Sequence, residues 1–153
     1  MQDSQIFPYE GLGHLRFSMT RSEVRALLPI VPRTFREDPL APTETDDYYE
    51  LGMHLSYDAE DRLEFIETFP PCVPTFEGTA FIGLPLEVVV AAMKARGYGA
   101  TLGENGECTF SQVGIALYLP DTVESVAIYQ RGYYEKYQDA YRDYYSRLYP
   151  IGG

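Results

Sequence analysis

The sequence predicts an α+β fold, in which an antiparallel sheet is built from two similar helix-plus-hairpin halves and a C-terminal amphipathic helix follows. Two observations lead to this prediction. A helical apolar period is followed by an alternating strand period in residues 10–69 and again in residues 78–131. Residues 132–149 then return to a helical period. The chain has 153 residues, 45% of them hydrophobic, so we expect a single domain over residues 1–153.

The first helix is predicted within residues 17–28, FSMTRSEVRALL. Thr20 stands in the N-cap position and Glu23 follows three residues later, which is the spacing of a capping box. Pro29 ends the helix. The apolar residues at helical spacing form the face expected to be buried: Val24, Leu27 and Leu28. The opposite face is expected to contact water: Arg21, Ser22 and Arg25.

The next segment is rich in proline and acidic residues and has no clear period. Four prolines fall within residues 29–47, which end in the acidic run ETDD. Either a short edge strand occupies residues 33–36 or the segment is a functional loop. A hairpin with the alternation of a half-buried sheet follows, turning at DAED. Its first strand alternates Met53, Leu55 and Tyr57 with polar residues, and its second alternates Leu63 and Phe65 with Glu64 and Ile66.

The second half repeats the plan of the first at nearly constant spacing. Phe81 lies 64 positions after Phe17, and Glu87 lies 64 positions after Glu23. The strand regions match at a spacing of 62, most clearly in the pairs Tyr48/Phe110, Gly52/Gly114, Leu55/Leu117 and Ile66/Ile128. The second helix is expected to bury Val88, Val89, Ala91, Ala92 and Met93. These matches favour an internal duplication, with chance similarity in an apolar chain as the alternative.

The C-terminal segment is the most distinctive part of the chain by composition. A helix is predicted from residue 133 to residue 148, and six of the 14 tyrosines lie between Tyr133 and Tyr145. Tyrosine combines a large apolar area with a polar tip, which suits binding interfaces. The alternative is that the helix packs on its own domain with the hydroxyl groups at the rim.

The charge excludes some classes of partner. The chain has 23 acidic and 12 basic side chains, a net charge of −11 with histidine neutral. Nucleic acids and anionic lipid surfaces select clustered lysine and arginine, so neither is expected as a partner. A basic protein would be attracted, although the charge could also serve solubility alone. No signal peptide or apolar span is recognised, which favours the cytoplasm, where Cys72 and Cys108 would be free thiols.

No catalytic or cofactor motif stands out, and we expect neither an enzyme nor a bound cofactor or metal. His54 lies in an alternating strand, where a packed or surface imidazole is more common than a general base. The acidic residues of DAED lack the full pattern of a calcium loop and are interpreted as a hairpin turn.

The phrase FSMTRSEV, with Gly13 before it, resembles the G-M-T-x-x-E-V helix start of small bacterial proteins built of helix-plus-sheet units. The tandem arrangement is similar to that of beta-lactamase-inhibitor-like proteins, and each half is similar to the BamE-type fold. Ser18 stands where that pattern often has glycine, and the second copy has Leu84 and Pro85 instead of Met-Thr. The small, acidic and aromatic-rich chain also resembles, in general character, bacterial toxin immunity proteins.

Together these features favour a non-enzymatic protein-binding module, of the kind of an immunity-type inhibitor of a basic toxin or enzyme. The residues expected to contact the partner come from two regions. The predicted helix 133–148, here called the tyrosine helix, contributes Tyr133, Tyr134, Tyr137, Tyr141, Tyr144 and Tyr145. The acidic segment 44–49 contributes Glu44, Asp46, Asp47, Tyr48 and Tyr49. One alternative is a small-ligand-binding protein or enzyme with a cleft between the two halves, using His54 or Tyr118. Another is a homodimer that forms through the tyrosine helix.

Overall fold

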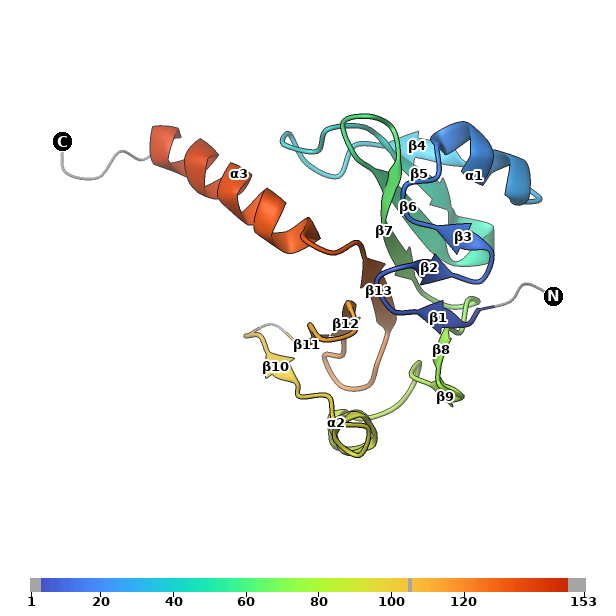
Figure 1. Cartoon of the computed structure of the whole chain (residues 1–153), viewed down its shortest axis with the longest axis vertical. Helices are drawn as coiled ribbons and strands as arrows, with labels where there is room; N and C mark the ends of the chain where they lie inside the picture. The colour runs from blue at the N-terminus through green and yellow to red at the C-terminus, as the bar shows by residue number, and fades with distance from the viewer. Residues whose placement is uncertain (1–3, 105, 149–153) are drawn as a thin grey trace.

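The computed structural model describes residues 4–104 and 106–148 (Figure 1). Its helices are α1 (Arg21–Leu27), α2 (Leu86–Lys94) and α3 (Tyr133–Leu148), with a 3₁₀ turn, η1 (Tyr49–Leu51). A three-stranded sheet comprises β1 (Ile6–Phe7), β2 (Gly11–Leu12) and β3 (Leu15–Arg16), and a hairpin comprises β8 (Thr75–Phe76) and β9 (Thr79–Ala80). No helix in the described ranges is both long and apolar enough to cross a membrane.

The main sheet has eight strands, and every neighbouring pair is antiparallel. In spatial order the strands are β10 (Thr101–Leu102), β11 (Glu107–Phe110), β12 (Ile115–Tyr118), β13 (Ser125–Tyr129), β7 (Leu63–Thr68), β6 (Met53–Tyr57), β5 (Thr45–Tyr48) and β4 (Arg33–Phe35). The predicted α+β class, with antiparallel pairing and a C-terminal helix, is confirmed. Of the two alternatives for residues 33–36, the edge strand is present as β4.

The two central strands, β7 and β13, join the two meanders of the sheet. Ile66 lies directly opposite Ile128, and Phe65 lies opposite Tyr129. From this pair one meander runs outward through β6 and β5 to β4, and the other runs through β12 and β11 to β10. The sheet is therefore continuous across the segment that separates the two helix-plus-hairpin regions.

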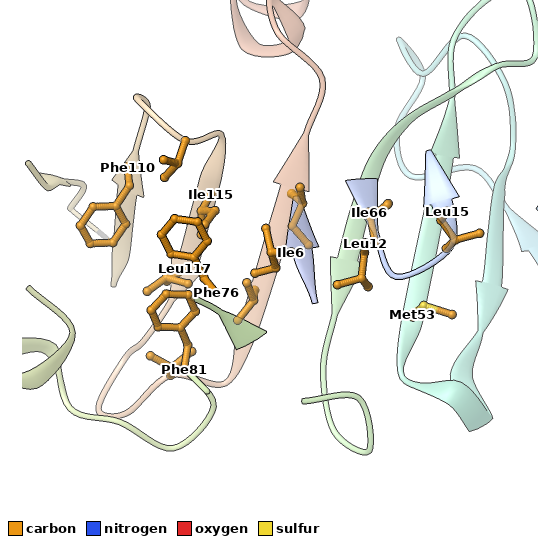
Figure 2. Packing of buried hydrophobic residues seen from close by; sticks show 14 of the residues in the cluster. Ile6, Leu12, Leu15, Met53, Ile66, Phe76, Phe81, Phe110, Ile115 and Leu117 are labelled. Atoms are coloured by element: carbon orange, nitrogen blue, oxygen red, sulfur yellow. The ribbon is translucent and has the colours of Figure 1, made fainter. Parts of the chain in front are cut away.

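One face of the sheet carries the hydrophobic core. Alternate residues of the strands, among them Leu55, Ile66 and Leu117, are buried against α1, α2 and the three-stranded sheet. Figure 2 shows the layer of buried side chains extending from Leu15 to Phe110, with Ile6 between these ends. The N-terminal residues therefore contribute strands and core side chains.

The start of α1 follows its sequence signals. Thr20 Oγ1 accepts a hydrogen bond from the Glu23 backbone N–H at 3.2 Å, and Glu23 Oε1 accepts one from the Thr20 N–H at 3.2 Å. This confirms the predicted capping box. Val24 is buried and Leu28 is partly buried, as expected, but Leu27 is 49% exposed, so the prediction that Leu27 is buried is wrong.

The buried face of α2 differs from the expected one. The helix begins after Pro85, and it is Val89 and Met93, one turn apart, that enter the core. Val88 and Ala91 face outward, with Val88 45% exposed. The prediction that Val88 and Ala91 are buried is wrong, because an apolar run such as VVVAAM does not specify which of its residues face the core.

A β-bulge interrupts the hairpin of β6 and β7. The register shifts between Ser56, which lies opposite Phe65, and Tyr57, which lies opposite Leu63. Glu64 is the additional residue in β7. Leu63 and Ile66 therefore both enter the core, and the strict alternation predicted for this strand is wrong. The bulge directs Glu64 to the C-terminal helix, where it contacts Lys136 and Tyr137.

Candidate functional site

The face of the sheet opposite the core, here called the outer face, is hollowed into a groove of about 1010 Å³. The groove crosses the central strands β7 and β13 and is bounded by the first turns of α3. Its aromatic walls are Tyr9, Phe65, Tyr118, Tyr129 and Tyr134. Aromatic side chains on an uncovered sheet face supply the apolar area and the hydroxyl groups of a binding interface.

The C-terminal helix contacts the outer face through its first turns. The ring of Tyr133 stacks on that of Phe65 at a centroid distance of 4.7 Å, and the ring of Tyr134 meets that of Tyr129 edge-on at 4.7 Å. The rest of α3 projects from the body of the protein, on the side away from α1 (Figure 1). The alternative that this helix simply packs on its own domain therefore holds for its N-terminal part.

A smaller cavity of about 350 Å³ lies between residues 37–45 and α3, and it is here called the Glu64 cavity. The Glu64 side chain lines it and is almost fully buried, at 1% exposure. Lys136 Nζ lies 2.5 Å from Glu64 Oε1, and the Tyr137 hydroxyl donates a hydrogen bond to Oε2. Burial, reinforced by the hydrogen bond to Glu64, raises the pKa of Tyr137, so this hydroxyl remains a proton donor.

Both hollows are acidic. Among the described residues that line them, Glu37, Asp38 and Glu64 belong to the cavity, and Glu67, Glu107 and Glu135 belong to the groove. The groove also contains Arg131, whose guanidinium lies 4.0 Å from the centre of the Tyr9 ring. Carboxylates that converge on a low-dielectric hollow attract a cationic ligand or a basic protein surface.

Two residues predicted to contact a partner are instead in the interior. Asp46 and Tyr48 are both fully buried, because their side chains lie on the core face of β5. Asp46 accepts hydrogen bonds from Arg21 Nη1 at 2.8 Å, from Arg25 Nη2 at 2.7 Å and from the Tyr57 hydroxyl at 3.0 Å. The predictions that Arg21 faces water, and that Asp46 and Tyr48 form an interaction surface, are wrong, whereas Arg25 pairs with Asp46 and stays 42% exposed as expected.

The other predicted contact residues are distributed over the surface. Tyr133, Tyr134 and Tyr137 line the Glu64 cavity. Glu44 and Tyr49 are exposed, and Asp47 is half-buried; none of the three lines the groove or the cavity. Three more belong to α3 but have side chains outside the described part of the structure: Tyr141, Tyr144 and Tyr145.

The sequence interpretation missed several residues of the site, including Tyr9, Phe65, Glu107 and Tyr129. The available signal was Phe65 and Tyr129, which carry aromatic rings on the polar side of alternating strands. An aromatic residue that faces outward on a strand marks an apolar surface for another element to pack on, and here the first turn of α3 packs on both rings.

His54 joins three neighbouring strands on the outer face. Its Nε2 lies 3.2 Å from Asp47 Oδ1, and its Nδ1 lies 3.2 Å from Glu67 Oε1. The hydrogen bond to Glu67, followed by the charges of Glu67, Asp47 and Glu37, raises the pKa of His54. A protonated imidazole is stabilised by both carboxylates, through the hydrogen bond to Glu67 and the charge of Asp47, whereas the neutral ring loses the attraction to both charges.

This contact predicts a stability that depends on pH. Because the folded-state pKa of His54 is raised, the stabilisation is fully present below the unfolded-state pKa of about 6.5 and is lost as pH rises through the folded-state value. We expect His54→Gln to cost on the order of 1 kcal/mol at pH 5.5 and less at pH 8.5, measured by urea unfolding. A difference between the two proteins that does not change with pH would contradict this role.

Both cysteines are free, as predicted: Cys72 is half-buried and Cys108 is buried. In the described ranges, no group of three or more His, Cys, Asp or Glu side chains is arranged to hold a metal ion. Comparisons of the chain with protein-family models, with curated proteins and with solved structures find no match.

Proposed function

We propose that this chain is a non-enzymatic binding module that acts in the cytoplasm as an immunity-type inhibitor and binds a basic protein through its outer face. The observation that carries the proposal is the groove, a hollow on the outer face that combines aromatic walls with converging carboxylates. The aromatic rings would act as buried anchors, and the carboxylates would steer the encounter and exclude acidic competitors.

We also propose that the fold consists of two related halves, as in the tandem helix-plus-sheet proteins that the sequence resembles. Equivalent hydrogen bonds support this. The Leu63 carbonyl accepts a hydrogen bond from the Ser18 N–H, and the Leu63 N–H donates one to the Met19 carbonyl, both at 2.8 Å. In the same way, the Val123 carbonyl accepts a hydrogen bond from the Gly83 N–H, and the Val123 N–H donates one to the Leu84 carbonyl, both at 2.9 Å.

The backbone angles and the central strand pair agree with this duplication. Ser18 and Gly83, whose N–H groups donate equivalent bonds, both have left-handed φ angles, 74° and 87°. The helix starts match at a spacing of 65, which aligns buried Val24 with buried Val89 and replaces the spacing of 64 expected from sequence. Ile66 and Ile128, 62 positions apart, pair with each other, as a two-fold axis between the halves requires.

The proposed binding face can be tested with two double variants of identical charge change. Glu107→Lys with Glu135→Lys reverses two charges in the groove, whereas Glu87→Lys with Asp121→Lys reverses two at and beside α2. The wild-type chain should capture a basic protein from the native lysate at low salt. We expect the groove variant to bind that protein at least about tenfold more weakly and the α2 variant to bind it unchanged. Equal effects of the two variants would contradict the proposal.

A small-ligand-binding protein or enzyme is the second candidate function. It is favoured by the position of the groove, which crosses the junction of β7 and β13 between the two proposed halves, and by Tyr118, which lines it as expected. His54 does not line either hollow. A metabolite screen by thermal shift tests this candidate. A compound that raises the unfolding temperature of the wild type and not that of Tyr118→Ala would support it.

A further inference from the structure

We propose that the Glu64 cavity is a pocket for one organic cation, the ammonium or guanidinium group of a lysine or arginine side chain. The assignment of that side chain to a protein partner rests on the proposed function. The chemistry of the pocket does not, because it can be tested with small probes in the absence of any partner.

The first argument is the state of Glu64. A carboxylate that is 1% exposed is costly to bury unless a positive charge and hydrogen bonds compensate it. The compensating charge is Lys136, whose side chain is 52% exposed and belongs to the helix that leaves the body of the protein. The buried acid is therefore neutralised by an ammonium group that can return to water at little cost.

The second argument is the composition of the walls. Tyr133, Tyr134 and Tyr137 line the cavity, and Lys136 Nζ already lies 4.8 Å from the centre of the Tyr137 ring. An ammonium group is thus held between a carboxylate and an aromatic ring, which is the environment that proteins use to recognise organic cations. A volume of about 350 Å³ also falls within the range of small-molecule sites.

The third argument is the remaining charge. Glu37 and Asp38 also line the cavity, from the loop opposite α3, and add negative charge to it. An incoming cation would therefore be attracted even while Lys136 is in place. We infer that it displaces Lys136 from Glu64, and that the Tyr137 hydroxyl keeps its hydrogen bond to the carboxylate.

If this inference is correct, Lys136 competes with the ligand for Glu64. That role predicts a different effect of removing Lys136 than a purely structural role does. If the ion pair only fixes α3 to the sheet, removing Lys136 should loosen the tyrosine walls and weaken binding. If Lys136 occupies the position of the ligand, removing it should free the carboxylate and strengthen binding.

The experiment is an NMR titration of the full chain with Nα-acetyl-lysine amide and Nα-acetyl-arginine amide, with Nα-acetyl-norleucine amide as the uncharged control. We expect saturable shifts at Glu64 and Tyr137 with at least one cationic probe and none with the control. Lys136→Met should tighten binding by about fivefold, and Glu64→Gln should weaken it by at least about tenfold. Arg142→Met removes one positive charge from an exposed position of the same helix and should leave binding unchanged.

Absence of binding by both cationic probes, or weaker binding by Lys136→Met than by wild type, would overturn the inference. Lys136→Met keeps the test valid if Glu64→Gln fails to fold. Spermidine, titrated in parallel, distinguishes the source of the cation: tighter binding than either amide would assign the pocket to a free polyamine. A captured basic protein with no probe binding would contradict the pocket alone, whereas probe binding with no captured protein would contradict the proposed function alone.

Discussion

Asp46→Ala is expected to destabilise the folded protein by about 3 kcal/mol, because it leaves the largely buried guanidinium of Arg21, 15% exposed, without its buried counter-ion and removes the partner of Arg25, which is 42% exposed. Asp46 is fully buried, and its carboxylate binds both Arg21 and Arg25 of α1. Arg21 also pairs with Asp61, which is half exposed and compensates only part of the charge. Urea unfolding at neutral pH measures the loss.

Glu44→Ala is the matched control, since it removes an exposed carboxylate two residues away and should change stability by less than about 0.5 kcal/mol. The second proposed half suggests a rescue, because the positions equivalent to Arg21, Arg25 and Asp46 are Leu86, Val90 and Cys108. We expect a variant with the same kinds of residue in the first half to recover most of the lost stability, since buried ion networks can be replaced by apolar groups at little cost. This variant is Arg21→Leu, Arg25→Val, Asp46→Val and Tyr57→Phe. A loss below about 1 kcal/mol in Asp46→Ala would contradict the importance of the network.

Gly52→Ala is expected to have the second large effect, a loss of at least about 3 kcal/mol. Gly52 has a left-handed φ of 75°, and a Cβ there would lie 2.0 Å from the Phe69 carbonyl oxygen and 2.7 Å from the Cys72 nitrogen. Both neighbours are backbone atoms, and the Phe69 N–H donates to the Gly52 carbonyl at 2.9 Å. The loop after β7 must therefore move to accommodate a methyl group.

Gly83→Ala separates this clash from the cost of the backbone conformation. Gly83 has a similar φ of 87°, but a Cβ there meets no atom within 4 Å. Only the left-handed conformation should count against alanine, at about 1 kcal/mol. Thermal unfolding of the two variants gives the comparison, and equal shifts of the midpoint would contradict the steric argument for Gly52.

The features that were predicted correctly depend on residues close together in the chain. Three features each require only a local pattern: the capping box of Thr20 and Glu23, the alternation of buried Met53 and Leu55 with less buried residues, and the helical period of α3. Local patterns specify an element but not always its buried face. This is why Val88 was assigned to the core although it is exposed.

The features that were missed depend on contacts between distant segments. The acidic run at Asp46 has the composition of a surface loop, and its burial becomes favourable through the approach of Arg21 and Arg25 from α1 and the hydroxyl of Tyr57. The bulge that turns Glu64 towards α3 shows no signature in the sequence of β7. The groove is lined by β7 from the first half of the sequence, by β10 to β13 from the second half and by α3, so no single stretch of sequence could indicate it.

The most direct test of the outer face as the binding surface is hydroxyl-radical footprinting of the chain with and without its captured partner. Tyr118 and Tyr134 line the groove and are 44% and 43% exposed, whereas Tyr49 is 72% exposed and lies outside it. The proposal predicts that the partner protects Tyr118 and Tyr134 from oxidation and leaves Tyr49 unchanged. Protection of Tyr49 with no protection of Tyr118 or Tyr134 would contradict it.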